Sequence, residues 1–154
     1  MPSERTRAAM TSDEVTALLA ASRKVQLATI NADGTPHLVT MFYVLREGRI
    51  AFWTYRASQK ARNLARDPRL TCLVEDGEDY FELRGVQVRG VAHLIDDRPG
   101  VAAIGRLVAT QLLGVPADAV GDYVEQAARK RVAYVVEPVR IASWDHRKLV
   151  SQPG

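Results

Sequence analysis

The feature that most constrains the fold is a turn, Asn-Ala-Asp-Gly at residues 31–34, between two segments with the pattern of β-strands. Asn, Asp and Gly tolerate the positive φ angles that tight hairpins need. Residues 25–30 precede this turn, and residues 36–45 follow it. A second turn at Glu47-Gly48 leads into a third strand over residues 49–55. Two successive hairpins require antiparallel pairing, so this part of the chain is predicted to form an antiparallel sheet.

The rest of the chain predicts three more strands and four helices. The strands are expected at residues 70–75, 80–95 and 131–140, and the helices at 12–21, 59–66, 99–113 and 117–130. Gly85 and Gly90 lie inside the fifth strand and predict bulges or a barrel corner. Residues 1–10 are expected to be a loose lead-in. The predicted fold class is mainly β with helices, a single domain over residues 1–154 built on a six-stranded antiparallel barrel.

Composition excludes several classes of protein and of site. The apolar runs are a handful of residues, against the ~20 that a membrane-spanning helix needs, and no secretory signal is recognisable. The single cysteine, Cys72, excludes an internal disulfide framework and favours the cytoplasm. The three histidines lack ligand spacing, so no metal site is expected. The net charge of +3 suggests an anionic partner, but the arginines are too dispersed for a nucleic-acid-binding stripe.

The second and third strands are apolar on both faces. In the second strand, Leu38, Thr40 and Phe42 alternate with Val39 and Met41. Only one face of a strand in a small barrel points inward, so the outer face must be covered. A partner subunit together with a planar ligand would cover it, which predicts a dimer with a binding site. The alternative is that the protein's own helices cover this face.

A candidate anion site follows the third strand. Ser58 can cap a helix at residues 59–66, with Arg56 just before the helix and Lys60 in its first turn. A lysine in a first turn opposes the helix dipole, and a bound phosphate or carboxylate would explain its presence there. The alternative is a solvated basic face, on which Arg62 is the more solvent-facing residue.

Several motifs together resemble a known family. They are Asp33-Gly34-Thr35-Pro36-His37, Phe52-Trp53-Thr54, Ser58-Gln59-Lys60-Ala61, Asn63-Leu64, Asp67-Pro68-Arg69 and the closing residues 143–149. This set resembles the split-barrel flavin and deazaflavin oxidoreductases, which include pyridoxamine 5′-phosphate oxidase. The closing segment resembles the actinobacterial branch that uses the deazaflavin coenzyme F420. The resemblance implies a six-stranded split barrel, a homodimer and two cofactor sites at the subunit interface.

The resemblance also implies which residues bind the cofactor. Gln59 and Lys60 correspond to the phosphate site, with Ser58 capping the same helix, and Arg56 lies beside it. Trp53 and Thr54 correspond to positions at the ring system. The strand along the ring edge contributes Val39, Thr40, Met41 and Phe42, largely through backbone groups. Trp144 is expected to approach the site from the other subunit.

Departures from the family pattern narrow the expected chemistry. Gln59 and Val39 occupy positions that are often basic in the oxidases that use FMN, and the C-terminal Arg-x-His element is absent. The expected function is therefore F420-dependent hydride transfer to a conjugated acceptor such as an enone or quinone. An FMN enzyme and a non-catalytic cofactor-binding protein are the alternatives. No catalytic acid is identified. Tyr43, Tyr55 and His37 are candidates only by their closeness to the predicted site.

Overall fold

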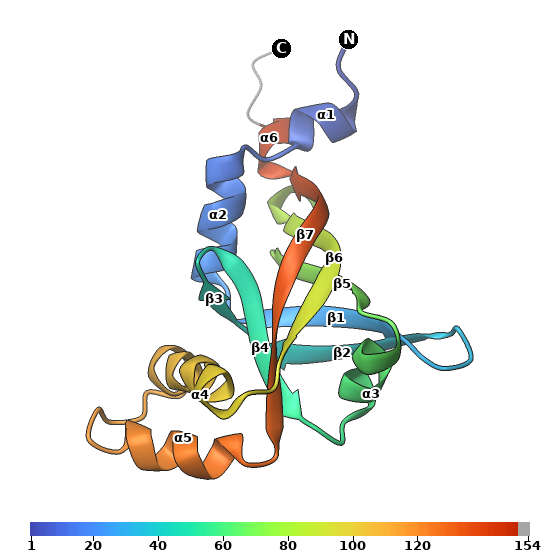
Figure 1. Cartoon of the computed structure of the whole chain (residues 1–154). Helices are drawn as coiled ribbons and strands as arrows, with labels where there is room; N and C mark the ends of the chain where they lie inside the picture. Colours follow the sequence, from blue (N-terminus) through green and yellow to red (C-terminus); the bar gives the residue numbers. More distant parts are fainter. Residues whose placement is uncertain (151–154) are drawn as a thin grey trace.

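One antiparallel sheet of seven strands forms the frame of the protein in the computed structural model (Figure 1), which describes residues 1–150. The last four residues of the predicted domain, 151–154, lie outside the described residues. The strand order is β2-β1-β5-β6-β7-β4-β3. The strands are β1 (Lys24–Ile30), β2 (Pro36–Phe42), β3 (Val44–Arg46), β4 (Arg49–Tyr55), β5 (Arg69–Asp76), β6 (Arg84–Ile95) and β7 (Arg131–Asp145). The sheet curls so that β1 and β2 run across the direction of β4 and β7, which makes a half-open barrel.

The predicted fold class is confirmed, but the count of six strands is wrong because the predicted second strand divides at Tyr43. The Tyr43 ring is buried, and its hydroxyl donates a hydrogen bond of 2.6 Å to the carbonyl of Leu19. Before this point β2 pairs with β1, and after it β3 pairs with β4. The buried tyrosine thus marks the place where the chain passes from one side of the barrel to the other.

The predicted first hairpin is confirmed. β1 and β2 pair from Lys24↔Phe42 to Ile30↔Pro36, and Gly34 has a φ of +85°. The Asp33 carboxylate accepts hydrogen bonds from the amide and hydroxyl of Thr35, and these bonds lower the pKa of Asp33. The turn is therefore held both by glycine's conformational freedom and by an Asp side chain.

The last strand is longer than predicted because it continues past a proline. Pro138 lies opposite Gly90, where the register between β6 and β7 shifts by one residue. A proline lacks the N–H that a regular ladder needs, and a bulge tolerates its absence. The bulge expected at Gly90 is confirmed. Gly85 has a different role, because the ring of Trp144 packs directly on it.

The helices largely follow the predicted positions. They are α1 (Glu4–Ala8), α2 (Ser12–Ala21), α3 (Gln59–Arg66), η1 (Tyr80–Glu82), α4 (Arg98–Leu107), η2 (Val108–Leu112), α5 (Val120–Ala128) and α6 (Arg147–Val150). Thr11 and Glu14 form a capping box at the start of α2. The helix predicted at 99–113 changes to π-helical geometry at Val108, and the one predicted at 117–130 is shorter at both ends.

The N-terminal segment is not the loose lead-in that was expected. It contains α1, which lies against α6 near the C-terminus (Figure 1). Lys148 of α6 donates a hydrogen bond to the carbonyl of Ala9, and the amide of Met10 donates one to the hydroxyl of Ser143. These bonds connect the first ten residues to the end of β7. Such long-range contacts leave no local pattern in the sequence.

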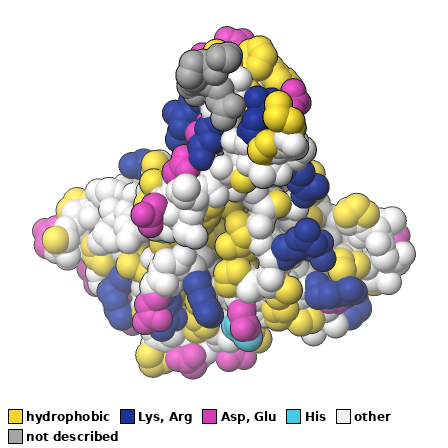
Figure 2. All heavy atoms as spheres, turned by 90° about the horizontal axis from the view of Figure 1, so that it is seen from above, with side chains coloured by type: hydrophobic (Ala, Val, Ile, Leu, Met, Phe, Trp, Pro, Cys, Tyr) yellow, Lys and Arg dark blue, Asp and Glu magenta, His cyan; other side chains and the backbone are white. Residues whose placement is uncertain are grey.

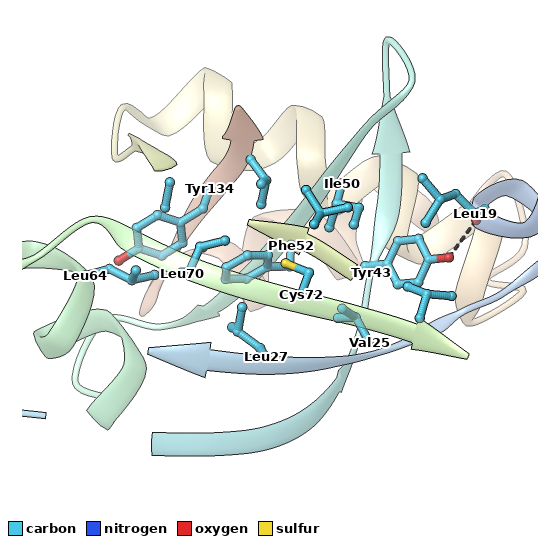
Figure 3. Packing of buried hydrophobic residues seen from close by; sticks show 14 of the residues in the cluster. Leu19, Val25, Leu27, Tyr43, Ile50, Phe52, Leu64, Leu70, Cys72 and Tyr134 are labelled. Carbon is cyan, nitrogen blue, oxygen red and sulfur yellow. Dashed lines mark hydrogen bonds between the residues drawn. The ribbon is translucent and has the colours of Figure 1, made fainter. Parts of the chain in front are cut away.

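The main core fills the barrel (Figure 3). Within this core the rings of Phe52 and Tyr134 stack, with 5.3 Å between their centroids. Cys72 is fully buried there, and burial raises the pKa of its thiol to about 12. A thiol with that pKa is neutral at physiological pH, which agrees with a structural rather than nucleophilic cysteine.

The two apolar strand faces are covered in different ways. On β4, α4 and η2 cover the outer face, with Ile104 and Val108 packed on Ala51 and Trp53. On this strand, therefore, the protein's own helices cover the outer apolar face, as the alternative expectation has it. On β2, Leu38 and Phe42 remain 67% and 58% exposed. The described part of the chain therefore leaves the outer face of β2 uncovered.

None of the helices described is long and apolar enough to cross a membrane. Figure 2 shows that basic, acidic and apolar side chains are interspersed over the face seen from above. This face carries no continuous basic stripe.

Candidate functional site

The site is built around the start of α3, immediately after β4. Ser58 caps the helix, because its hydroxyl accepts a hydrogen bond of 3.2 Å from the amide of Ala61. The buried hydroxyl of Thr54 donates a second hydrogen bond to Ser58 and so ties the cap to the end of β4. The amide N–H groups of Gln59 and Lys60 have no partner within residues 1–150. The first turn of α3 therefore offers free donors to an anion.

Asn63 fixes α3 to the barrel. Its side chain is fully buried, and Nδ2 donates hydrogen bonds of 3.0 Å to Thr29 and Asn31 on the β1 side. Its Oδ1 accepts from Gln59 and Arg66. A buried polar group with every bond satisfied specifies one orientation of the helix. The first turn of α3 is thereby held at one place relative to the sheet.

Lys60 is a half-buried cation without a counter-charge. Its ammonium group makes no hydrogen bond or ion pair with residues 1–150. Burial lowers the pKa of Lys60 because the charged form loses hydration. The position in the first turn of α3 adds an unfavourable interaction with the helix dipole. Both costs would be offset by an anion bound beside the ammonium group.

A pocket of about 320 Å³ opens next to Lys60. Its volume lies at the lower end of the ~300–1,000 Å³ of small-molecule sites. The pocket brings together five of the predicted cofactor-binding residues: Met41, Phe42, Trp53, Thr54 and Lys60. The other lining residues are Tyr55, Val108, Leu112, Leu113, Tyr123 and Arg131. An apolar pocket with a cation at its edge suits a planar ring system that carries an anionic substituent.

Arg131 is the main residue that sequence reasoning missed. Its guanidinium lies 4.2 Å from the ring centroid of Tyr55 and 4.9 Å from that of Trp53. Nη1 donates a hydrogen bond of 2.7 Å to the carbonyl of Ala127, which orients the group over the two rings. Arg131 faces Tyr55 across the β4–β7 ladder. The available signal was a basic residue at the start of the last strand, but its partner strand could not be identified from the sequence.

The other six predicted residues do not line this pocket. Val39 and Thr40 lie on β2 just before the pocket residues Met41 and Phe42. Ser58 and Gln59 make hydrogen bonds within the start of α3. Arg56 lines a larger neighbouring cleft between α4 and α5. Trp144 lies in a different pocket, with Tyr80 and His146 near the chain termini. Within one chain, Trp144 is therefore separate from the pocket beside Lys60.

Of the three candidate proton donors, only Tyr55 lines the pocket. Tyr43 lies in the core, where its hydroxyl is bound to Leu19, and burial raises its pKa to about 12. The suggestion that Tyr43 lies near the site is therefore wrong. His37 lies on β2 outside the pocket, and its Nδ1 is buried without a hydrogen-bond partner. No group of three or more His, Cys, Asp or Glu residues within 1–150 could hold a metal ion.

Comparison with known protein families identifies the fold. The family model described as pyridoxamine 5′-phosphate oxidase matches residues 11–145. The chain belongs to this family. The resemblance stated from the sequence motifs is thereby confirmed, and so is the split-barrel fold.

Solved structures place the chain in the wider group with this fold. A conserved hypothetical protein, Rv2991 from Mycobacterium tuberculosis, is 38% identical, with a TM-score of 0.90, and the match covers 99% of this chain and 95% of that one. An F420 reductase is 22% identical with a TM-score of 0.58, covering 82% of this chain and 94% of the other. The haem storage protein HutZ from Vibrio cholerae is 14% identical with a TM-score of 0.64, covering 86% and 94%. The last two show a shared fold only. A search of curated proteins gave no match.

Proposed function

We propose that the protein is a homodimeric, F420-dependent oxidoreductase that transfers a hydride between the deazaflavin and a conjugated organic acceptor. The observation that carries this proposal is the unpaired, half-buried Lys60 at the edge of the pocket that Trp53 and Met41 line. A phosphate on the cofactor would accept from Lys60 and from the free amides of α3. The ring system would lie in the pocket, against β2 and β4.

The residues present fit such a group. Free amides and an uncompensated ammonium bind a phosphate in the way helix N-termini commonly do. The apolar lining from Met41, Val108 and Leu112 suits a planar ring. When bound, the deazaflavin would supply the hydride chemistry, and the protein would supply binding and orientation.

We propose F420 rather than FMN as the cofactor because of the residues at two positions. Gln59 and Val39 are neutral where FMN oxidases of the resembling family are often basic. Gln59 is also occupied internally, because its side chain donates to Asn63. Proteins with this fold include an F420 reductase and an FAD-binding protein from Mesorhizobium loti, so the fold itself does not select the cofactor.

We propose a homodimer because two strands carry exposed apolar side chains. These are Leu38 and Phe42 on β2 and Val139 and Ile141 on β7. A soluble protein gains by covering such side chains with a second copy. A partner would also bring further residues, with Trp144 the proposed one, to a pocket that is small for a whole cofactor. The single buried cysteine suits a reducing compartment, and we propose the cytoplasm.

A non-catalytic cofactor-binding protein is the second candidate. It is favoured by the pocket lining, which contains no carboxylate or histidine that could act in an acid–base pair. A haem storage protein shares this fold, which supports a storage or binding role as the second candidate.

Titration of the cofactor-free protein separates these possibilities. The protein is titrated with F420 and with FMN while tryptophan fluorescence is followed, and reduced cofactor is then offered with a panel of enones and quinones. Tighter binding of F420 and oxidation of reduced F420 by an acceptor would support the proposal. Tighter binding of FMN would overturn the choice of cofactor. Binding of F420 without turnover on any acceptor would favour the storage role.

A further inference from the structure

A second cavity, larger than the one beside Lys60, lies between α4 and α5, which pack side by side next to β4 and β7 (Figure 1). Its volume is about 670 Å³. Its lining includes small or apolar residues, among them Val101, Ala102, Gly121 and Val124. Five arginines line it: Arg56, Arg98, Arg106, Arg129 and Arg131. Asp96 and Glu125 are the acidic residues of the lining, so positive charge is in excess.

The arginines are not neutralised within the protein. No ion pair or side-chain hydrogen bond within residues 1–150 involves the guanidinium of Arg56, Arg98, Arg106 or Arg129. Asp96 and Glu125 are likewise unpaired, although they line the same cleft. Like charges gathered in a concave site repel each other, and the repulsion is relieved by an anionic ligand. Guanidinium groups are also the side chains best suited to bidentate binding of carboxylate and phosphate.

Arg98 adds an independent observation. It is the first residue of α4, where the positive end of the helix dipole makes a cation unfavourable. The neighbouring Asp97 makes no ion pair with Arg98, and its carboxylate accepts a hydrogen bond from the amide of Gly100. Arg98 thus resembles Lys60: each is an unpaired cation in a first helical turn at the edge of a cavity.

We propose that this arginine cleft binds a small polyanion, a molecule with several carboxylate or phosphate groups, that is distinct from the cofactor. Arg131 separates the cleft from the proposed cofactor pocket, since it lines both cavities and stacks on Trp53 and Tyr55. A polyanion bound by Arg131 would therefore lie next to the ring site without occupying it. The proposal concerns binding alone, and it does not depend on which cofactor the protein uses.

Isothermal titration calorimetry on the full chain without cofactor tests the proposal. Citrate serves as the polycarboxylate, tripolyphosphate as the polyphosphate and acetate as the monoanion. We expect one of the first two to bind at one site per chain and acetate to bind far more weakly. Whichever binds more tightly identifies the carboxylate or phosphate chemistry. Binding should weaken between 20 and 200 mM NaCl, because the arginines are exposed.

Two variants and a control assign the binding to the cleft. Arg98→Gln and Arg129→Gln should each weaken binding about tenfold, the usual effect of losing a charge-assisted hydrogen bond. Arg46→Gln removes the same charge from an exposed site outside the cleft and should leave the affinity within about twofold. Melting temperatures should not fall in any of the three, and that of Arg98→Gln should be unchanged or slightly higher, because Arg98 opposes the dipole of α4. Equal weakening in the control would mean general electrostatic attraction, and would overturn the proposal.

Competition with the cofactor supplies the last test. The titration is repeated with F420 or FMN at saturation, as established from tryptophan fluorescence. Retained polyanion binding supports a separate site. Loss of binding would show that the cleft belongs to the cofactor site, and absence of any polyanion binding in the free protein would also overturn the proposal. Neither result bears on whether the protein turns over F420.

Discussion

Gly105 of α4 lies against the indole of Trp53, so closely that a Cβ atom added at Gly105 would be 2.5 Å from Cζ3 of that ring. The guanidinium of Arg131 lies over the same ring, 4.9 Å from its centroid. Gly105 is also in the middle of a helix, where glycine costs roughly 1 kcal/mol relative to alanine. The contact with Trp53 gives a physical reason for glycine at this position.

Gly105→Ala should therefore displace the indole ring. We expect a changed tryptophan emission maximum and at least tenfold weaker cofactor binding, despite the better helix propensity of alanine. Gly121→Ala on α5 is the matched control, because a Cβ there has nothing within 4 Å. The control should keep its affinity and show an equal or slightly higher melting temperature. Unchanged emission and affinity in Gly105→Ala would mean that the ring does not need this space.

Trp53→Phe tests whether Trp53 is at the ring site. Cofactor binding should quench tryptophan emission in the original protein, because Trp53 lines the pocket beside Lys60. Most of this quenching should disappear in Trp53→Phe. The remainder is the signal of Trp144, and Trp144→Phe measures it separately. Full quenching in Trp53→Phe would contradict the proposed position of the ring.

Local signals explain why much of the fold was predictable. The turn at residues 31–34 and the cap at Ser58 are each encoded by a few neighbouring residues, and both are present in the structure. The roles of Gly105 and Arg131 depend on α4 packing on β4 and on the pairing of β4 with β7. These contacts join segments about 50 to 80 residues apart, and no periodicity within one segment encodes them.

The same reasoning explains the error at Tyr43. Alternation along residues 36–45 predicts one strand, because hydrophobic periodicity gives no sign of where a strand changes its partner. The change of partner occurs at Tyr43, whose hydroxyl donates a hydrogen bond to the carbonyl of Leu19 on α2, a tertiary contact. A buried tyrosine hydroxyl needs a hydrogen-bond acceptor, and this need can determine where a strand leaves one partner for another.

Leu38→Asp tests the proposed dimer. Leu38 is exposed on the outer face of β2, so a charge there costs little in a monomer. In a dimer interface the same carboxylate would be buried without a partner, which costs several kcal/mol. We expect light scattering to show a dimer for the original protein and a monomer for the variant at micromolar concentration. A monomer in both cases would exclude the dimer, and with it a contribution from the partner's Trp144.

Asn63→Ala should destabilise the protein. The substitution leaves Thr29 and Asn31 without their donor and removes the acceptor used by Gln59. Because Asn63 is fully buried, we expect the free energy of unfolding to fall by roughly 2–4 kcal/mol, measured by urea denaturation. Gln59→Ala removes one exposed partner of the same network and should cost under about 1 kcal/mol. Similar small losses in both variants would show that the network does not hold α3.

Lys60→Ala distinguishes an anion site from a solvated basic face. The ammonium is unpaired and opposes the dipole of α3, so its removal should leave the melting temperature unchanged or slightly higher. Loss of a charge-assisted bond to a phosphate should weaken cofactor binding by roughly tenfold or more. Arg62→Ala removes one positive charge from the same helix and should have a much smaller effect. Equal, small effects in both variants would identify these residues as a solvated surface.

The pH dependence of cofactor affinity is a second test of whether Lys60 binds the anion. Burial lowers the pKa of Lys60, so the free protein loses this charge at a lower pH than an exposed lysine does. A bound phosphate stabilises the ammonium and raises its pKa, which by linkage means that binding is strongest below the lowered pKa and weakens as pH rises through it. We expect cofactor affinity to fall as pH approaches the ordinary lysine range, and Lys60→Ala to lose this dependence. An identical pH profile in the variant would show that Lys60 does not hold the anion.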